Sequence, residues 1–463
     1  MYSRYRCLLS VGLLLVAAGC AHGRTASRPE AIRARTGSAG PQASAERVEP
    51  NGVVTLADAV SFALVNHPAL HAFPWARQAA EARELQARLL PNPELEFEIE
   101  EFGGAGDRRG FDGAETSLQL GQLIELGDKR FKRTRLAEID KDLTQWDYES
   151  QKLDVMYKVT LAFIETLAAQ EQMSPVQELV GLSERTYEAV QQRVTAGKDP
   201  PVDQAKARVA VANARLGLAR AERQLDSVRA QLALAWGSKT PRFDSVRGDF
   251  YRIAPIPAPD DLTPLMADNP DLARWEAQMR RRWALLEVEK AKRVPDVGLR
   301  AGVRHFNETD DTAFVMGFSI PLPAFDRNQG GIEAAGQMLA KTRDDRETAL
   351  MAARTALARA LESASVAFVE ANVLADDVLP MAQSAYEATD EGYRQGKFNY
   401  LQVLDAQRTL FEAKLQYVTS LATYHRSRAT IERLIGQALP EPEPSATPIS
   451  TSKPLSEELS DEK

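Results

Sequence analysis

The sequence predicts a mainly α-helical fold with a small β part, in which one structural unit occurs twice. Three observations support this prediction: long stretches rich in good helix formers, four short runs in which apolar and polar residues alternate, and an internal repeat. A chain of 463 residues with 44% hydrophobic and 26% charged residues can bury a sizeable core. Its net charge of −8 gives no support to nucleic-acid binding.

The internal repeat is visible at widely spaced landmarks. A shift of 202 residues relates Pro68 to Pro270, and a shift of 199 residues relates Gly197 to Gly396. A nearly constant shift over such a distance is typical of a duplicated unit. The two copies are predicted to span residues 51–250 and 255–439.

Each copy is expected to begin with a helix, to continue through two strands into a very long helix, and to end with a turn and a last helix. Thr55 and Asp58 provide a start signal for the first helix, and Thr263 opens its counterpart. Pro175 and Pro380 are expected to kink or interrupt the two very long helices. The predicted helices are 55–90, 129–196 and 202–236 in the first copy and 262–293, 329–395 and 400–437 in the second.

Four alternating runs, 94–102, 115–122, 296–305 and 313–320, predict the strands. Each run is near the length that a tilted strand needs to cross a bilayer. A sheet packed on the helices of a soluble protein would alternate in the same way. Four strands cannot close a small barrel, and lipid does not tolerate an open edge, so a membrane sheet requires several chains. Three copies would supply twelve strands.

The membrane interpretation assigns opposite roles to the two faces of these strands. On one face the side chains are predicted to touch lipid, and on the other face they are predicted to line an aqueous outlet. The lipid-facing residues would be Leu95, Phe97, Ile99, Phe314, Met316 and Phe318. The lumen residues would be Glu94, Glu96, Glu98 and Glu100, partly balanced by Arg300 and Arg304.

The first twenty residues predict a lipoprotein signal peptide. Arg4 and Arg6 precede a short apolar stretch that ends in "VAAGC", which resembles a lipobox with Cys20 as the lipidated residue. The alternative is an ordinary signal peptide in which Cys20 is incidental. Residues 21–50 are expected to be flexible, and residues 440–463, rich in Pro, Ser and Glu, are expected to form a disordered tail.

The sequence gives little support to an enzyme function. It contains no G-x-S-x-G, phosphate-binding loop or H-E-x-x-H motif, and its only cysteines are Cys7 and Cys20. His67 and His71 have the spacing of a helical metal-ligand pair, but Pro68 lies between them at an expected break, and no third ligand is evident. We therefore expect a protein that is not an enzyme, without a cofactor and without a bound metal.

Taken together, these features resemble the outer-membrane factors of tripartite efflux pumps, the TolC family. The resemblance covers nearly all of the chain after the signal: the duplicated plan, "LADAVSFALVNHPAL" near the start, and two Gly-Lys turns. Two further motifs, "QLIELGDKR" at 122–130 and "IPLPAFDRNQGGI" at 320–332, are similar to segments of the cobalt–zinc–cadmium branch of this family.

The resemblance implies a homotrimer. Its twelve-stranded β-barrel would sit in the outer membrane of a Gram-negative bacterium and continue into a periplasmic α-helical coiled-coil barrel. The implied partners are outer-membrane lipid, a periplasmic adaptor and an inner-membrane pump of the resistance–nodulation–division class. The chain would be a passive exit duct for heavy-metal cations. Drug efflux or type I protein secretion through the same duct remains an alternative, as does a periplasmic lipoprotein scaffold without a pore.

In this family the gate lies in the turns between the paired helices. Many members carry Asp six residues after each tip glycine; Asp203 fits this position, and Gln402 occupies it in the second copy. Asp405 fits a further acidic position. Tyr393 matches a residue that can bond the Asp of the neighbouring hairpin, here Asp203. Phe398 stands where an Arg often completes this latch.

The remaining tip residues have plainer expected roles. Gly197 and Gly396 permit tight turns, because glycine adopts positive φ at little cost. Lys198 and Lys397 are candidates for contact with the adaptor, although exposed turn lysines can also serve only solubility. Likewise, acidic residues such as Asp203 can serve only to stabilise the first turn of a helix.

Overall fold

The computed structural model describes residues 49–439. The predictions for the signal peptide, Cys20, the segment up to residue 48 and the tail 440–463 lie outside these residues. The first repeat contains β1 (Gly52–Thr55), α1 (Leu56–Asn66), α2 (Pro68–His71), α3 (Phe73–Arg88), β2 (Glu94–Glu100), β3 (Glu115–Ile124), α4 (Lys129–Thr195) and α5 (Pro201–Ala235). After β4 (Phe243–Arg247), the second contains α6 (Pro259–Leu262), α7 (Pro270–Lys292), β5 (Val297–Phe306), β6 (Asp311–Ser319), α8 (Gln329–Val373), α9 (Leu379–Arg394) and α10 (Tyr400–Ile435).

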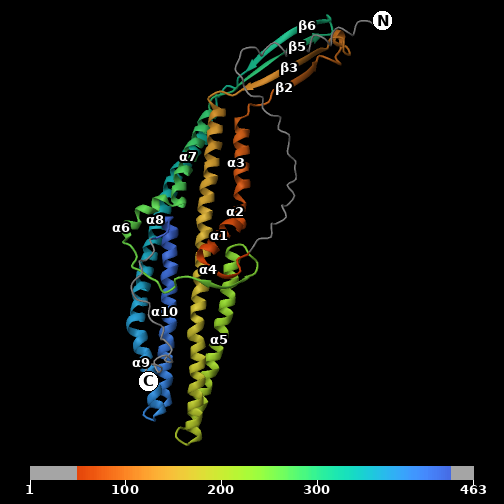
Figure 1. Ribbon diagram of the computed structural model, residues 1–463. Coiled ribbons are helices and arrows are strands. Elements are labelled where there is room, and N and C mark those ends of the chain that lie inside the picture. Colours follow the sequence, from red (N-terminus) through yellow and green to blue (C-terminus); the bar gives the residue numbers. More distant parts are fainter. Residues whose placement is uncertain (1–48, 440–463) are drawn as a thin grey trace, which may run out of the picture. The chain divides into compact units, whose positions relative to one another are not determined.

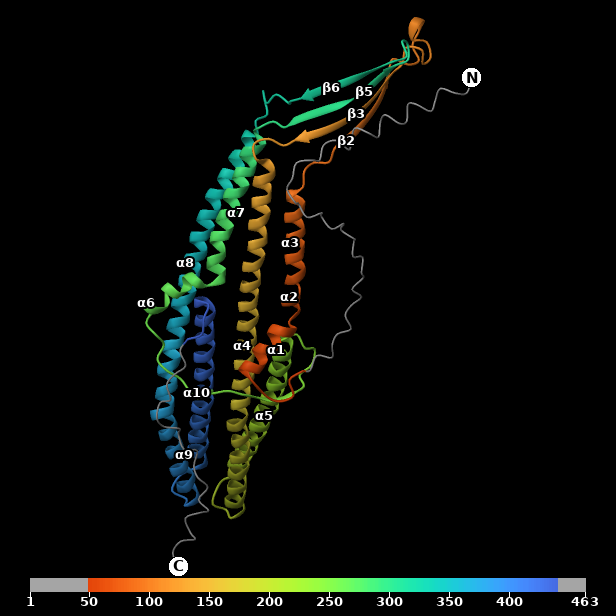
Figure 2. The same cartoon turned by 45° about the horizontal axis from the view of Figure 1, so that its top comes forward.

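The predicted order of long helices and paired strands is confirmed in both repeats. Helix α4 has 67 residues, a length of about 100 Å at about 1.5 Å per residue. It packs against α3 and α7 over one part of its length and against α5 and α10 over another, and both views show this arrangement (Figures 1 and 2). Because α7 and α10 belong to the second repeat, the two repeats form one compact unit.

The predicted helical stretch 55–90 forms three helices, and the break expected at Pro68 is confirmed. Its start is as expected: Thr55 caps α1, and Asp58 completes a capping box. The chain breaks at His67, which is extended with ψ 125° before Pro68. A residue before proline avoids the helical region, so α2 begins only at Pro68.

The predicted helix 262–293 begins later than expected. Residues 259–268 form the short helix α6 and a 3₁₀ helix (Pro264–Asp268), and α7 starts at Pro270. Asn269 caps α7, because its side chain accepts a hydrogen bond from the Asp271 amide at 2.8 Å. The amide nitrogen of the Asn269 side chain also donates to the carbonyls of Arg433 and Leu434. One side chain thus joins the start of α7 to the end of α10.

The two prolines in the very long helices behave differently. A π-helical turn (Leu374–Val378) separates α8 from α9 immediately before Pro380, as an interruption there predicts. No interruption occurs at Pro175, because α4 continues through it. Contacts on both sides hold α4 in place: Thr166 bonds the Val228 carbonyl of α5, and Ser183 bonds Gln407 of α10.

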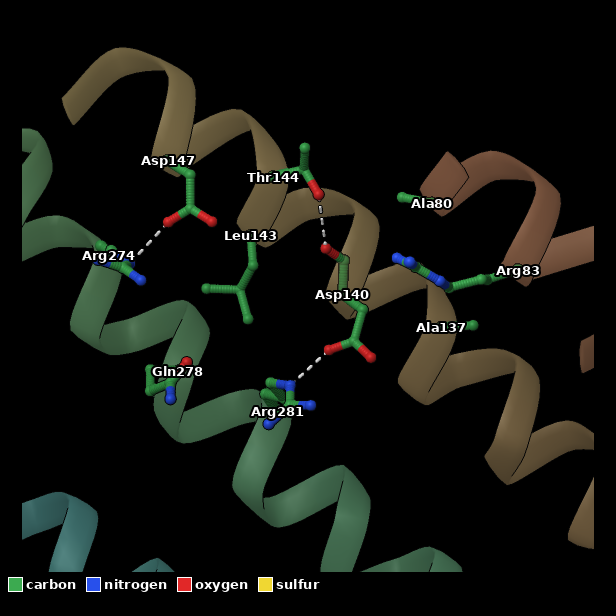
Figure 3. Close-up of a pocket in the computed structure, with 10 residues that line it drawn as sticks. All are labelled: Ala80, Arg83, Ala137, Asp140, Leu143, Thr144, Asp147, Arg274, Gln278 and Arg281. Atoms are coloured by element: carbon green, nitrogen blue, oxygen red, sulfur yellow. Dashed lines mark hydrogen bonds and ion pairs between the residues drawn. The ribbon is translucent and has the colours of Figure 1, made fainter. Parts of the chain in front are cut away.

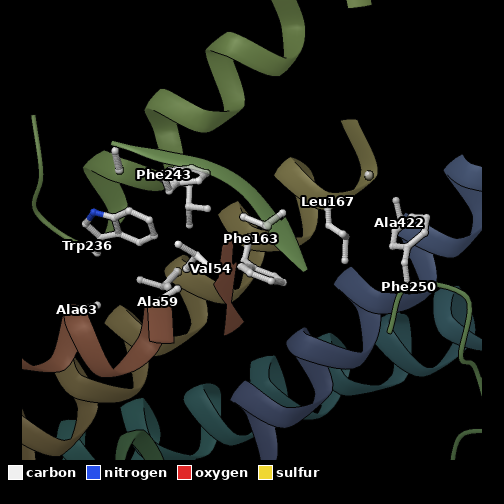
Figure 4. Packing of buried hydrophobic residues seen from close by; sticks show 14 of the residues in the cluster. Val54, Ala59, Ala63, Phe163, Leu167, Trp236, Phe243, Phe250 and Ala422 are labelled. Carbon is white, nitrogen blue, oxygen red and sulfur yellow. The ribbon is translucent and has the colours of Figure 1, made fainter. Parts of the chain in front are cut away.

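A cluster of buried apolar residues lies in the middle of the unit. It includes residues of two strands, β1 and β4, that the sequence analysis missed. Strands β1 and β4 pair in parallel, so that the start of the first repeat lies beside its end. Val54 of β1 and Phe243 of β4 are each 1% exposed and pack with Trp236 and Phe163 (Figure 4). Strands of four and five residues are too short for an alternating pattern to reveal them.

Candidate functional site: the sheet and the hairpin tips

The four predicted strands form one antiparallel sheet in the order β2-β3-β5-β6. Its register places apolar residues directly across from one another: Phe97 lies opposite Leu118, Leu118 opposite Val303, and Val303 opposite Phe314. A second row continues from Leu95 to Met316 through Leu120 and Ala301. The alternation in each strand therefore becomes one continuous apolar face.

This apolar face is exposed. Phe314, Met316 and Phe318 of β6 have exposed fractions of 86%, 87% and 76%, and Leu95 and Phe97 of β2 have 72% and 63%. Isolated apolar residues on a surface are common, but a contiguous patch of this kind marks a site of contact. The exposure argues against a sheet packed on the helices of the same chain.

The opposite face of the sheet is polar and carries ion pairs. Arg300 contacts Glu96 at 3.1 Å, and Arg304 contacts Glu100 at 3.1 Å and Glu115 at 2.7 Å. The two arginines therefore balance part of the acidic row, as the sequence predicts. Glu94 and Glu98 share this face, and no ion pair joins either of them to another of the described residues 49–439. The face retains an excess of carboxylates.

Both edges of the sheet lack a neighbouring strand within residues 49–439, because β2 and β6 end the strand order. An edge strand presents unpaired backbone amides and carbonyls, which form a template for another chain. None of the helices in this part of the chain combines the length and the apolar composition that a membrane span requires.

The other candidate region lies at the far ends of the helical hairpins, where α4 turns into α5 and α9 turns into α10. Gly197 and Gly396 occupy the two turns with φ of +69° and +76°, a conformation that other residues adopt only with strain. Each helix end closes through a backbone bond to the residue after this glycine, from Lys198 to Arg193 and from Lys397 to Gly392. The predicted turns are confirmed.

A charged latch joins the two hairpins. The guanidinium of Arg193 contacts both carboxylate oxygens of Asp199 at 2.8 Å and 3.0 Å and also donates to the backbone carbonyl of Tyr393 at 3.1 Å. The hydroxyl of Tyr393 donates to Asp199 at 2.7 Å. Tyr393 is 1% exposed, and its ring centroid lies 4.8 Å from the Arg193 guanidinium carbon. Hydrogen bonds to a charged partner of this kind are the stronger ones in proteins.

The electrostatics of the latch agree with its geometry. The Arg193 hydrogen bond holds the pKa of Asp199 below its ordinary range, partly opposed by burial. Burial, followed by the hydrogen bond to Asp199, raises the pKa of Tyr393. At neutral pH the latch therefore consists of a carboxylate, a guanidinium and a protonated phenol.

The predicted partner of Tyr393 is wrong. Tyr393 bonds Asp199, whereas the sequence analysis named Asp203, which lies four residues further on and contacts Lys206 at 3.6 Å. The arginine expected to be missing is supplied by Arg193 of the first hairpin. Asp199 stands before the prolines that begin α5, and neither spacing nor hydrophobic period identifies it. The available signal was the placement of Arg193 and Asp199 on either side of Gly197.

The other predicted gate residues have separate positions. Gln402 forms a capping box with Asn399 at the start of α10, with distances of 3.0 Å and 3.1 Å, so it has a structural role there. Asp405 is exposed on α10 and is not part of the latch. Lys198 and Lys397 are exposed in the two turns. Their roles in a gate or in adaptor contact stay predictions.

One histidine of the pair that the sequence analysis weighed as a metal site, His67, caps a helix. His67 Nδ1 accepts a hydrogen bond from the Ala69 amide at 3.2 Å and thereby caps α2. Burial lowers the pKa of His67, with a smaller contribution from Lys158. Within residues 49–439, no group of three or more His, Cys, Asp or Glu side chains is placed to hold a metal ion.

A cavity of about 320 Å³ lies among α3, α4 and α7 (Figure 3). Asp147 of α4 contacts Arg274 of α7 at 3.0 Å, and Asp140, two helical turns away, pairs with Arg281. Since these four charged residues are already paired across the two repeats, the cavity is best explained as a structural joint.

Comparison with known proteins agrees with this architecture. The family model described as "Outer membrane efflux protein" matches twice, at residues 59–238 and 263–437. The chain is 36% identical to the cobalt-zinc-cadmium resistance protein CzcC of Cupriavidus metallidurans, over 84% of this chain and 91% of that protein. It is 25% identical to the nickel-cobalt-cadmium resistance protein NccC of Alcaligenes xylosoxydans xylosoxydans, over 60% of this chain and 63% of that protein.

The fold also matches a solved channel. A crystal structure of CusC, a protein that forms a transmembrane channel, superposes with a TM-score of 0.70 at 19% identity, covering 84% of this chain and 94% of that one. The predicted fold class and outer-membrane location are thus confirmed, as is the resemblance to efflux outer-membrane factors. The chain belongs to the outer membrane efflux protein family.

Proposed function

We propose that this chain forms the outer-membrane exit duct of a tripartite efflux system that exports heavy-metal cations. The observation that carries this proposal is the four-stranded sheet, with an exposed apolar face, an acidic face and two unpaired edges among the described residues 49–439. In a bilayer the apolar face contacts lipid, and backbone groups at the edges must find partners. Those partners are the edge strands of other copies.

Three copies supply twelve strands, enough to close a barrel around a water-filled lumen. In this assembly β6 of each copy pairs with β2 of the next, and the Glu94–Glu100 row faces the lumen. The carboxylates in excess over Arg300 and Arg304 give the lumen a negative potential that favours cations. Cys20, when lipidated, adds an anchor to the same membrane.

The helices extend the duct into the periplasm, and the hairpin tips carry its gate. Exposed Lys198 and Lys397 in the two turns offer contacts to a periplasmic adaptor, which links the duct to an inner-membrane pump. The duct is passive and catalyses no reaction, so the choice of metal rests mainly with the pump. The metal assignment is supported by the 36% identity to a cobalt-zinc-cadmium resistance protein.

A strain lacking this gene tests the substrate. We expect the deletion to lower tolerance to one or more of zinc, cobalt, cadmium, copper and silver, and the intact gene to restore it. Unchanged tolerance to all five metals would contradict metal export. If the deletion strain became sensitive only to drugs, or lost only a secreted protein, the duct would instead serve drug efflux or protein secretion.

A matched pair of substitutions on β6 tests the wall of the duct. Met316→Arg places a charge on the apolar face, where it costs about 2–4 kcal/mol per copy in a bilayer, so we expect loss of channels and of metal tolerance. Val315→Arg, on the other face of the same strand, is expected to keep both. Channels are measured as single-channel currents in planar bilayers. Equal effects of the two substitutions, or no channels from the unmodified protein, would favour a scaffold without a pore.

A further inference from the structure

An apolar stripe runs along the exposed side of α5. Its residues follow one another at steps of three and four, the spacing of contact positions in a coiled coil: Val202, Ala205, Val209, Ala212, Leu216 and Ala219. The three larger side chains, Val202, Val209 and Leu216, have exposed fractions of 55%, 59% and 50%. The buried Ala207 and Ala214 lie on another side of α5, so this α5 stripe is open to a further helix.

A second apolar stripe runs along α8 and α9. The α8–α9 stripe consists of seven exposed residues: Val366, Val369, Val373, Val378, Met381, Ala385 and Ala388. Its five larger side chains have exposed fractions between 36% and 69%. The steps are again three or four residues, except that Val378 follows Val373 by five. In a regular α-helix this extra residue would turn everything from Val378 onward by about 100°, because each residue turns the helix by that angle.

The π-helical turn Leu374–Val378 lies at this exception. A π turn holds one residue more than an α-helical turn, so it absorbs the extra residue and keeps the two parts of the stripe in line. Pro380 alone does not explain the π turn, because α4 continues as an α-helix through Pro175. The continuity of the α8–α9 stripe is therefore the feature that the π turn preserves.

The two stripes belong to opposite edges of the helical layer. Helix α5 packs against α4, α4 against α10, and α10 against α8 and α9, and both views show α5 and α9 as the outer members of this row (Figures 1 and 2). In a ring of identical chains, the α5 edge of one copy meets the α8–α9 edge of the next. Helix α5 runs away from the hairpin tips and α9 runs toward them, so these two helices meet antiparallel.

The spacing from the turns brings side chains of complementary size together. Arg193 of the first hairpin bonds the Tyr393 carbonyl of the second, so the two turns of one chain lie at nearly the same height. Ala212 and Met381 are each 15 residues from the glycine of their turn. In a ring, Met381 of one copy is therefore level with Ala212 of the next, a large side chain opposite a small one.

The charges beside the stripes are complementary as well. Residues 202–223 of α5 carry more cations than anions: Lys206, Arg208, Arg215, Arg220 and Arg223 against Asp203 and Glu222. Residues 366–391 contain neither Lys nor Arg but six acidic residues: Glu370, Asp376, Asp377, Glu387, Asp390 and Glu391. Two like edges would repel each other, so the charges favour contact between unlike edges. Contacts of this kind form a ring when the rotation between copies closes.

We propose that the π-helical turn keeps the α8–α9 stripe continuous so that it packs antiparallel against the α5 stripe of a second copy of this chain, with Met381 level with Ala212. This contact rests on the proposed function, because it requires several copies arranged in a ring. The residues that join the copies in their helical part, and the role of the π turn, go beyond that function.

Cross-linking in outer membranes tests the contact. A chain with both Ala212→Cys and Met381→Cys, treated with a short bismaleimide, is expected to be linked in threes. Each single variant measures the background from Cys20 and is expected to give no such links. Ala212→Cys with Met351→Cys is the matched control pair, because Met351 is also exposed, at 54%, but lies about 45 Å further along α8.

Links in threes from the first pair, and none from the control pair, support the proposal. The absence of links from the first pair overturns it and leaves the stripes for a different partner, such as a helix of the adaptor.

Deletions in the π turn test its role in the same double-cysteine chain. Removing Asp376 takes out only the extra residue, so the stripe stays in line along a continuous α-helix and the links are expected to persist. Removing both Asp376 and Asp377 turns the following residues by about 100° and is expected to abolish the links. Circular dichroism checks that both variants keep their helices. Loss of the links in both variants, or in neither, overturns the proposal.

The mass of the assembly separates this result from the test of the proposed function. If the unmodified protein has the mass of three chains but the first cysteine pair gives no links, the helical contact is wrong and the ring stands. If the unmodified protein is a single chain, both are wrong.

Discussion

The two hairpin tips have the same backbone and different side chains. The shift of 199 residues that relates Gly197 to Gly396 also relates Arg193 to Gly392 and Asp199 to Phe398. In the first turn these two positions hold an ion pair. In the second, the Phe398 ring lies so close to Gly392 that a methyl group there would overlap it. The first turn is therefore closed by an ion pair between Arg193 and Asp199, and the second by the Phe398 ring packed on Gly392.

This difference indicates how the duplicated unit acquired a latch. An identical ion pair in both tips would place like charges together where the hairpins meet, which is unfavourable. With the charges confined to the first tip, the second can present Tyr393 as a neutral donor to Asp199. The turns keep the duplicated geometry, and the side chains have diverged into complementary halves.

The largest effect is expected from Arg193→Ala, which removes the ion pair of the first turn. It leaves the mostly buried Asp199 without its cation and Tyr393 without one contact, which costs about 2 kcal/mol in the described position of the hairpins. We expect a higher open fraction in planar bilayers. Arg394→Ala is the matched control in the second hairpin, because within the described part of the chain, residues 49–439, the ion pair of Arg394 is with Asp390 of its own helix. An equal effect of both substitutions would mean that the latch contributes nothing specific.

Gly392→Ala tests the uncharged turn. The added methyl group meets the Phe398 ring, and we expect a loss of about 1–2 kcal/mol of stability, measured as a lower midpoint of thermal unfolding. Gly336→Ala in α8 is the control, because a methyl group there meets nothing within 4 Å and alanine favours a helix. If both variants were stabilised, the aromatic closure of the second turn would be wrong.

Asp405→Ala allows the exposed carboxylate of Asp405, in the second hairpin, to be compared with the mostly buried carboxylate of Asp203 in the first. Three Asp405 side chains around an axis would attract cations, so we expect a lower cation preference, with little change in stability. The measurement is the reversal potential across a salt gradient. Asp203→Ala should change this potential less. Unchanged selectivity in Asp405→Ala would remove Asp405 from the gate.

The smallest expected effect is that of pH. The lowered pKa of Asp199 means that its contribution is present above the ordinary value of 3.8 and is lost only as pH falls through the lowered value. The raised pKa of Tyr393 means that its contribution is present below the ordinary value of 10.0 and is lost as pH rises through the raised value. The latch should therefore hold equally at pH 5 and pH 9. If the channel opened with a midpoint pH between 5 and 9, this expectation would be wrong.

Most of the architecture followed from local pattern. Alternation in β2 and β6 identified both faces of the sheet, because a strand exposes every second side chain on the same side. The duplicated glycines identified both turns. The continuity of α4 through Pro175 could not be predicted, since neighbouring helices hold it in place.

The latch was predicted only in part. Tyr393 was found through the family resemblance, but its partner depends on how two hairpins about 200 residues apart in sequence approach each other. In the sequence, the spacing from Gly197 favoured Asp203 over Asp199 as this partner. The hydrogen bond from the Tyr393 hydroxyl to Asp199 shows which of the two is used.

The number of chains in the assembly tests the central claim most directly, because four strands cannot close a barrel. The measurement is the molar mass of the protein purified from outer membranes in detergent, by light scattering corrected for bound detergent. The account predicts a mass equal to three chains, which separates into single chains when Met316→Arg disrupts the sheet. A single chain for the unmodified protein, in detergent and in membranes, would contradict it.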